Sequence, residues 1–342
     1  MIEGAPVIDV HHHFLPRGVF TALRAQAGGA RRLVNEQISL TLSDDLYQVD
    51  RHLAAMDTAG VDAAILTYSG VSILGMGICQ QLNDELAAVQ AAHPGRLYGA
   101  VHVPLQEPAA ALRELERGLR ALGLVAVALP TSAGPITLDA PSLTPLWEAI
   151  AALDAPIILH PALRPAGAPT EYHLERSCAR PFDTTLAAVR IMHAVVPRFP
   201  TLRFVLPHLG GTAIFLKGRL RMLYEPAGVP IPPEKRGLAK TVREQAALGL
   251  DVAFETAWRA FYFDTAGTGG WAPAVAMAVA EVGPERLLFG SDFPLESSSG
   301  ATMRELVEMV AHLPPPRPEL PEGWRAAIAS GTARALFPAL RG

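Results

Sequence analysis

Three consecutive histidines, His11 to His13, follow an apolar run near the start of the chain, and their spacing suits metal binding. Successive side chains of a β-strand alternate between its two faces, so His11 and His13 share one face and His12 takes the other. With His11 and His13 facing inward, two imidazole nitrogens lie within reach of one metal ion. In the opposite phase only His12 faces inward, and two buried polar rings need partners under the helices. We therefore expect the first phase.

Three other residues with metal-binding or proton-transfer side chains also follow apolar runs. His160 ends "IILH", His208 follows "VLP", and Asp292 stands in "GSDFP". Imidazole and carboxylate are the groups that bind zinc and similar first-row ions. Each residue alone has an ordinary structural explanation, such as a hydrogen-bonded core histidine or, for Asp292, an Asx turn. Because all of these residues stand at the ends of predicted strands, the set as a whole predicts a metal site.

The elements that position these residues are eight short apolar runs, most of them followed by a segment of helical length and pattern. The runs span residues 6–13, 61–69, 96–104, 124–131, 155–161, 201–211, 261–267 and 286–294. Continuous apolar strands that alternate with helices are typical of a parallel sheet covered on both faces. Eight such units predict an α/β fold, the closed (β/α)8 TIM barrel, with the active site at the C-terminal ends of its strands. An open doubly wound sheet is the alternative, but no GxGxxG motif follows the first strand.

Three connections are longer than ordinary loops. They predict small insertions after strands 1, 5 and 6 of the barrel, over residues 14–43, 162–182 and 225–258. No internal repeat of solenoid period is apparent, and we expect a single domain over residues 1–342.

The overall composition excludes several classes of protein. Of 342 residues, 50% are hydrophobic and 18% charged, and a net charge of -4 gives no electrostatic reason to expect a nucleic acid partner. No window approaches eighteen uninterrupted apolar residues, so we expect no membrane span. The two cysteines, Cys79 and Cys178, form no disulfide framework, and the N-terminus does not read as a signal peptide. We expect a cytoplasmic protein.

The motifs together resemble those of the amidohydrolase superfamily. Within it they are most similar to the aminocarboxymuconate-semialdehyde decarboxylase-like branch, often called amidohydrolase family 2. The similarity lies in the Asp9-x-His11-x-His13 opening, in "LH" at 159–160, in "PHLGG" at 207–211 and in "GSDFP" at 290–294, and it covers nearly the whole chain. The set is specific for the branch but not for a substrate.

This resemblance implies a site for one divalent ion. The residues that match the family's metal ligands are His11, His13, His160 and Asp292. The expected ion is Zn²⁺, with Mn²⁺ as the alternative, since both accept imidazole and carboxylate. No lysine follows the fourth strand at the place of the carboxylated lysine that bridges two metals elsewhere in the superfamily, so a single-metal site is expected.

The resemblance also implies roles in catalysis and substrate binding. His208 and Asp292 are the expected catalytic residues, and His208 matches the histidine that activates or orients the metal-bound water. Arg219, in "FLKGRL", matches an arginine that reaches into the neighbouring subunit and binds a substrate carboxylate. The alternative for Arg219 is a solvated or locally paired side chain on a helix. The first reading implies a small anionic organic substrate and a homodimer or higher homo-oligomer.

The branch implies a metal-dependent, non-oxidative decarboxylase of a small phenolic or unsaturated carboxylic acid. The alternative is a hydrolase of a lactone, ester or amide that uses the hydroxide bound to the same metal. A third possibility is a metal-binding protein without turnover. Among further candidates, His102 lines the pocket or is structural, Asp264 orients His208 or contacts substrate, and His12 packs outward. His173 stands in the long connection after the fifth strand and could belong to a lid.

Overall fold

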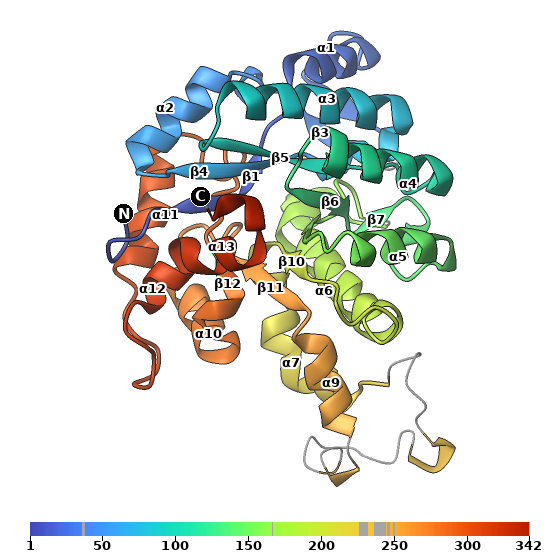
Figure 1. Ribbon diagram of the computed structural model, residues 1–342, viewed down its shortest axis with the longest axis vertical. Coiled ribbons are helices and arrows are strands. Elements are labelled where there is room, and N and C mark those ends of the chain that lie inside the picture. The colour runs from blue at the N-terminus through green and yellow to red at the C-terminus, as the bar shows by residue number, and fades with distance from the viewer. Residues whose placement is uncertain are drawn as a thin grey trace.

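Eight parallel strands form the centre of the fold in one sheet, in the order β1-β4-β5-β6-β9-β10-β11-β12. The computed structural model describes residues 1–35, 38–165, 167–225, 232–235, 244, 247–248 and 250–341. The strands are β1 (Ile8–His13), β4 (Ala63–Thr67), β5 (Leu97–His102), β6 (Ala126–Pro130), β9 (Ile157–His160), β10 (Phe204–Leu206), β11 (Phe261–Asp264) and β12 (Leu287–Leu288). Helices surround them in Figure 1. The predicted TIM barrel is confirmed.

The helices follow the strands along the chain and most of them cover the outside of the sheet, and α7 and α9 extend from its lower end in Figure 1. They are α1 (Arg17–Gln26), α2 (Val49–Ala59), α3 (Met76–Ala92), α4 (Pro108–Glu116), α5 (Thr144–Ala152), α6 (Arg180–Arg190), α7 (Ala213–Met222), α9 (Leu250–Trp258), α10 (Ala272–Val282), α11 (Gly300–Ala311), α12 (Trp324–Ala326) and α13 (Thr332–Leu336). Local signals set some of their ends. Gly60 ends α2 in the left-handed conformation with φ 73°, and Ser299 and Thr302 form a capping box at the start of α11.

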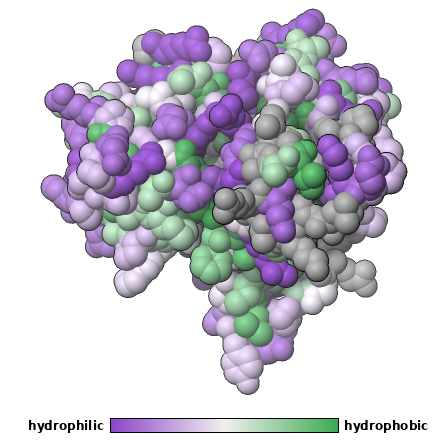
Figure 2. All heavy atoms as spheres, turned by 90° about the horizontal axis from the view of Figure 1, so that it is seen from below, coloured by the Kyte–Doolittle hydropathy of each residue, from purple (hydrophilic) through white to green (hydrophobic). Residues whose placement is uncertain are grey.

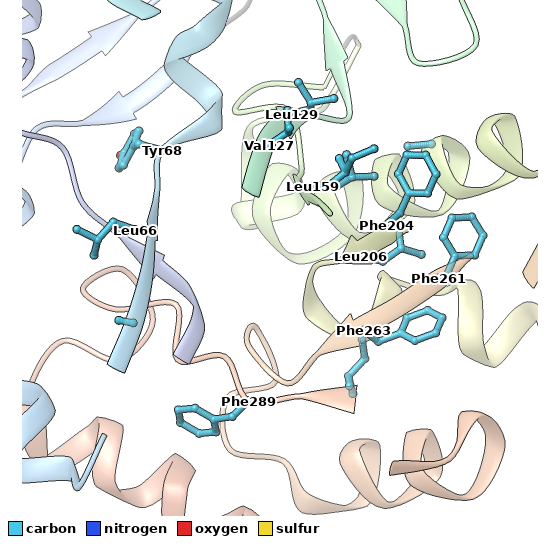
Figure 3. Packing of buried hydrophobic residues seen from close by; sticks show 14 of the residues in the cluster. Leu66, Tyr68, Val127, Leu129, Leu159, Phe204, Leu206, Phe261, Phe263 and Phe289 are labelled. Atoms are coloured by element: carbon cyan, nitrogen blue, oxygen red, sulfur yellow. The ribbon is translucent and has the colours of Figure 1, made fainter. Parts of the chain in front are cut away.

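Alternate residues of each strand belong to two different hydrophobic clusters. One set packs against the surrounding helices, and Figure 3 shows several of its members, among them Val127, Leu159 and Phe263. The other set is formed by smaller strand residues such as Ala128 and Ile158, which pack with the C-terminal helix α13. This alternation is the one expected of a barrel, in which one face of each strand lines the interior and the other lies under the helices.

The first and last strands close the barrel through a segment that is not itself a regular strand. The backbone N–H of Val10 donates to the carbonyl of Phe289, and that of His13 donates to the carbonyl of Phe293. In the opposite direction the N–H of Asp292 donates to the carbonyl of His11, at 2.9 Å. These bonds hold residues 289–293 beside β1 and thereby bring Asp292 next to the histidines.

A β-bulge in β1 sets the direction of the three histidines. The register of β1 against β4 shifts between Asp9 and His12. Val10 belongs to the interior cluster, so strict alternation would turn His12 inward and the other two histidines outward. The extra residue at the bulge reverses that phase, as bulges do, and turns His11 and His13 into the barrel.

The strands are all shorter than the predicted segments, and the difference is largest for two of them. The predicted segment 201–211 contains only β10, and the predicted segment 286–294 contains only β12. Each of these predicted segments also contains a predicted site residue in the left-handed conformation, since His208 has φ 56° and Asp292 has φ 51°. Non-glycine residues in the left-handed region often mark functional sites.

The regions of the predicted insertions hold different structures. Residues 14–43 contain α1 and a hairpin of β2 (Arg32–Val34) and β3 (Ser39–Thr41), and residues 162–182 contain short helical turns before α6. Much of the segment 225–258 lies outside the described residues. None of the helices in the described ranges is long and apolar enough to cross a membrane.

Candidate metal centre and active site

Four side chains from three regions of the barrel meet at the C-terminal ends of the strands. Their potential ligand atoms lie within 4.8 Å of one another, and the residues are His11 and His13 of β1, His160 of β9 and Asp292. Nε2 of His13 lies 3.3 Å from Nε2 of His11 and 2.8 Å from Oδ1 of Asp292. The structure thus brings together all four of the predicted metal ligands.

The hydrogen bonds of the three histidines leave the same nitrogen of each ring for a ligand. Nδ1 of His11 lies 2.8 Å from Oδ2 of Asp264, and Nδ1 of His160 lies 2.9 Å from the carbonyl of Pro161. Nδ1 of His13 faces the carbonyl of Thr67 at a longer 3.4 Å. Because these partners only accept, each Nδ1 donates, and Nε2 is the nitrogen of each ring that faces a ligand, where a metal ion would take the place of any proton.

The donor set fits a divalent metal ion. Three unprotonated Nε2 atoms and one carboxylate are a common ligand set for zinc. Oδ1 of Asp292 is buried and accepts no hydrogen bond in the described part of the chain, which is the condition of an atom that ligates an ion. Burial alone would raise the pKa of Asp292, but contacts with His13 and His11 lower that pKa below its usual range, so the carboxyl is ionised.

Asp264 links the metal ligands to His208. Its Oδ2 accepts from His11, while its Oδ1 accepts from the backbone N–H groups of His208 at 2.9 Å and Ala266 at 3.2 Å. Burial lowers the pKa of His11, but the carboxylates of Asp264, Asp292 and Asp9 together outweigh it and raise that pKa to about 9. Asp264 therefore orients His11 and fixes the His208 backbone, and this bond to Nδ1 would strengthen His11 as a metal ligand. Asp264 was expected to orient His208, and this is confirmed for the backbone of His208, whose N–H donates to Asp264.

His208 lies beside the four candidate ligands. Its ring stacks on that of His11 with centroids 5.0 Å apart, and its Nε2 lies 3.9 Å from Oδ2 of Asp292. Burial, together with the nearby His11, lowers the pKa of His208 to about 4, so the ring is neutral at pH 7. Its Nε2 is buried and has no hydrogen-bond partner in the described residues. A neutral imidazole with a free nitrogen can accept or return a proton.

The remaining strand-end histidines are structural. His12 faces away from the site, where its Nδ1 lies 2.9 Å from Asp9 and its Nε2 lies 2.8 Å from His52 of α2. This confirms the outward packing expected for His12. Nε2 of His102 accepts from the N–H of Tyr68, and Nδ1 lies 3.0 Å from the carbonyl of Ala100. With both nitrogens bonded to backbone, His102 supports the strand ends and does not line the pocket.

Two cavities lie in front of the candidate ligands. The inner one, here called the metal pocket, has a volume of about 40 Å³, which is room for little more than an ion and its water. It is lined by His13, Tyr68, Ser69, Gly70, His160, Leu163, Arg176, Arg180, His208, Asp292 and Leu295. The outer cavity has about 610 Å³, in the range of small-molecule sites, and is bordered by the β2–β3 hairpin and by the turns after β9. Tyr68, Leu163 and Arg180 line both cavities.

Tyr68 and Arg180 line both cavities but were not predicted as site residues from the sequence. Tyr68 follows β4 directly, but an apolar strand end with a tyrosine carries no distinctive signal. Arg180 begins α6, after a long connection whose fold no periodicity predicts. His173 of this connection lines the outer cavity. Arg219 lies exposed on α7, and it does not line the metal pocket of its own chain.

Comparison with known proteins defines the class of this barrel and its site. The sequence model of the amidohydrolase family matches residues 8–339, and the chain belongs to that family. It is 27% identical over 351 residues to 6-methylsalicylic acid decarboxylase of Penicillium expansum, covering 98% of this chain and 97% of that protein. The crystal structure of 5-carboxyvanillate decarboxylase from Sphingomonas paucimobilis superposes with a TM-score of 0.76 at 25% identity, covering 98% and 99% of the two chains.

A third similar protein carries a metal. A dihydroxybenzoic acid decarboxylase from Polaromonas, with bound manganese and the inhibitor 2-nitroresorcinol, shares the fold with a TM-score of 0.70 at 24% identity. The alignment covers 99% of this chain and 98% of the other. All three of these proteins are named as decarboxylases, and the similar proteins also include a 2-amino-3-carboxymuconate-6-semialdehyde decarboxylase of Dictyostelium discoideum. The resemblance noted from the motifs is confirmed.

Proposed function

We propose that this protein is a metal-dependent, non-oxidative decarboxylase that acts on a small phenolic or unsaturated carboxylic acid. The observation that carries the proposal is the cluster of His11, His13, His160 and Asp292, with the neutral His208 beside it. The similar proteins, which are decarboxylases of methylsalicylic, carboxyvanillic and dihydroxybenzoic acids, favour this reaction over hydrolysis of an ester, lactone or amide.

One divalent ion belongs in the cluster, held by the three Nε2 atoms and by the Asp292 carboxylate. Zn²⁺ is our first choice, because three imidazoles and a carboxylate suit it, and Mn²⁺ is the alternative. When bound, such an ion supplies a positive charge that polarises the oxygen atoms of a substrate. Asp292 would contribute a negative charge to the ion, and its Oδ2 lies 3.9 Å from Nε2 of His208.

His208 moves the proton that decarboxylation requires. Its free Nε2 takes up a proton and delivers it to the substrate carbon that bears the carboxylate. The bond between that carbon and the carboxylate then breaks, its electron pair returns to the ring or unsaturated system, and carbon dioxide leaves. Since the proton added to carbon replaces the lost carboxylate, the reaction needs no oxidant or reductant.

Arg219 binds the substrate carboxylate from a neighbouring subunit in this proposal, which makes the protein a homodimer or higher homo-oligomer. Exposed apolar side chains of α6, of α7 and of the residue that follows α7 support such an interface. They are Phe182, Leu186, Phe215 and Leu223. Figure 2 shows a face of the molecule where hydrophobic residues reach the surface among hydrophilic ones. Exposed apolar groups of this kind favour contact with another protein surface. Arg219 suits the proposed role because a guanidinium can bind a carboxylate through two parallel hydrogen bonds.

We also propose one catalytic domain over residues 1–342 and a cytoplasmic location, which suits two unpaired cysteines, Cys79 and Cys178. The test of the activity is release of carbon dioxide from a panel of hydroxybenzoic acids, measured with protein loaded with Zn²⁺ or Mn²⁺. In D₂O the product should carry deuterium at the carbon that lost the carboxylate. Turnover of esters, lactones or amides, without carbon dioxide release from any acid, would assign the site to the hydrolase alternative instead.

A further inference from the structure

Arg180 is one of two arginines in the described part of the chain that line both the metal pocket and the outer cavity, the other being Arg176. Arg180 comes from the start of α6, twenty residues after the ligand His160. A substrate that reaches the metal ligands from the outer cavity must therefore pass its guanidinium. Arg180 is also largely buried, with 16% of its side chain exposed.

The hydrogen bonds of Arg180 hold one end of its guanidinium and leave another part free. Nη2 donates to the carbonyl of Leu163 at 2.6 Å and to Oε1 of Glu175 at 3.0 Å. Nε is buried and has no hydrogen-bond partner among the described residues. Leaving a buried donor unpaired costs free energy, and more so for a charged group, so this group gains from a ligand that accepts hydrogen bonds.

The surroundings of Arg180 favour an anionic ligand. The Glu175 carboxylate balances one positive charge, but Arg176 adds another in both cavities. Tyr68 lines the same two cavities, and burial raises the pKa of its hydroxyl above its usual range, so the hydroxyl stays a donor. Burial lowers the pKa of Arg180 itself, as expected of a cation that lacks full solvation.

We infer that Arg180 binds the acidic group of the substrate at the mouth of the metal pocket, so that each chain supplies its own carboxylate-binding residue. This inference rests on the proposed function for the kind of substrate, an aromatic or unsaturated acid. It makes Arg180 a specificity-determining residue of the same chain, in addition to Arg219 of a neighbouring subunit, and the acid enters from the outer cavity.

The test compares an acid with the same molecule lacking its carboxylate. Binding of 2,6-dihydroxybenzoate and of resorcinol to the metal-loaded protein is measured by calorimetry, with the acid recovered and checked for carbon dioxide loss. Arg180→Met should weaken binding of the acid about 10- to 100-fold, the value of a charge-assisted hydrogen bond, and leave resorcinol binding unchanged. Arg180→Lys keeps the positive charge but not the planar guanidinium with its paired donors, and it should weaken binding of the acid by a smaller factor.

The matched control is Arg164→Met, because Arg164 lines the outer cavity but not the metal pocket. It should leave both affinities unchanged. If Arg180→Met weakened binding of the acid and of resorcinol equally, Arg180 would have only a structural role and the inference would be overturned. Unchanged binding of the acid in this variant, or a wild type that binds no acid, would overturn it too. Selective loss of acid binding in a protein that never releases carbon dioxide would refute the decarboxylase and leave the role of Arg180 standing.

Discussion

The double role of Asp264 makes Asp264→Asn an informative change. In the wild type, Oδ2 accepts from Nδ1 of His11, and Oδ1 accepts from the backbone N–H groups of His208 and Ala266. Asparagine replaces one of these oxygens by an NH₂ group, which can only donate. If NH₂ faces His11, Nδ1 must accept, and the ring proton moves to Nε2, the atom that faces the metal. If NH₂ faces the backbone, two N–H groups lose their acceptor.

Either orientation of the asparagine has a similar cost. A buried donor without an acceptor costs about 1–3 kcal/mol, and loss of the partner that orients a metal-binding histidine lowers metal affinity about 10- to 100-fold. We expect Asp264→Asn to fold and to bind Zn²⁺ less tightly by that factor, or about 1.4–2.8 kcal/mol. Competition between metal-free protein and a chromophoric chelator measures the affinity directly.

Glu114→Gln is the matched control for this experiment. Glu114 is another buried carboxylate, which bonds Asn83 and Arg117 on the outside of the barrel. Its amide variant should lower stability and leave Zn²⁺ affinity unchanged. The reasoning fails if Asp264→Asn binds Zn²⁺ as tightly as the wild type, or if both amides weaken binding equally.

Four further predictions concern the same site. His208→Ala should keep the metal, seen by elemental analysis, and lose turnover by about 10²- to 10⁴-fold. Gly267→Ala should also retain metal and slow turnover, since a Cβ there collides with the ring of His208 and Gly267 has φ 69°. Metal at 100 times its dissociation constant should raise the free energy of unfolding by about 2.7 kcal/mol in thermal scans, and a chelator should reverse this. Mixing Arg219→Ala with His208→Ala chains should restore part of the activity through hybrid oligomers that contain one intact site.

Each of these has a clear contrary result. Wild-type turnover in His208→Ala would remove that residue from proton transfer, and normal turnover in Gly267→Ala would show that the His208 ring position is not critical. A melting temperature that does not change when metal is added would contradict the proposal that the four side chains bind a metal ion. Inactive mixtures, with subunit exchange verified by mass spectrometry, would exclude a shared site at Arg219.

The barrel was predictable because parallel strands and helices leave separate patterns in the sequence. The cluster of four candidate ligands was predictable for a related reason, since the strand ends of one barrel converge and several of those ends carry a histidine or an aspartate. The direction of His11 and His13 was predicted correctly, but simple alternation from Val10 gives the wrong phase. A bulge supplies the correction, and a bulge leaves no readable mark in a sequence.

Other parts of the site depend on contacts that only the folded chain creates. His208 and Asp292 adopt left-handed conformations beyond the ends of β10 and β12, and the predicted strand ends were wrong there. Asp264 reaches across 253 positions to His11, so its partner cannot be read from spacing. Arg180 enters the pocket because the connection after β9 folds back over the barrel mouth, and tertiary packing rather than local pattern decides that path.

Anomalous diffraction from crystals of the metal-loaded protein tests the central claim most directly. We predict one peak per chain at the zinc or manganese edge, about 2.0–2.2 Å from the Nε2 atoms and from a carboxylate oxygen. Those atoms belong to His11, His13, His160 and Asp292. A peak bound by other residues, two peaks within the barrel mouth, or none at saturating metal would contradict the account.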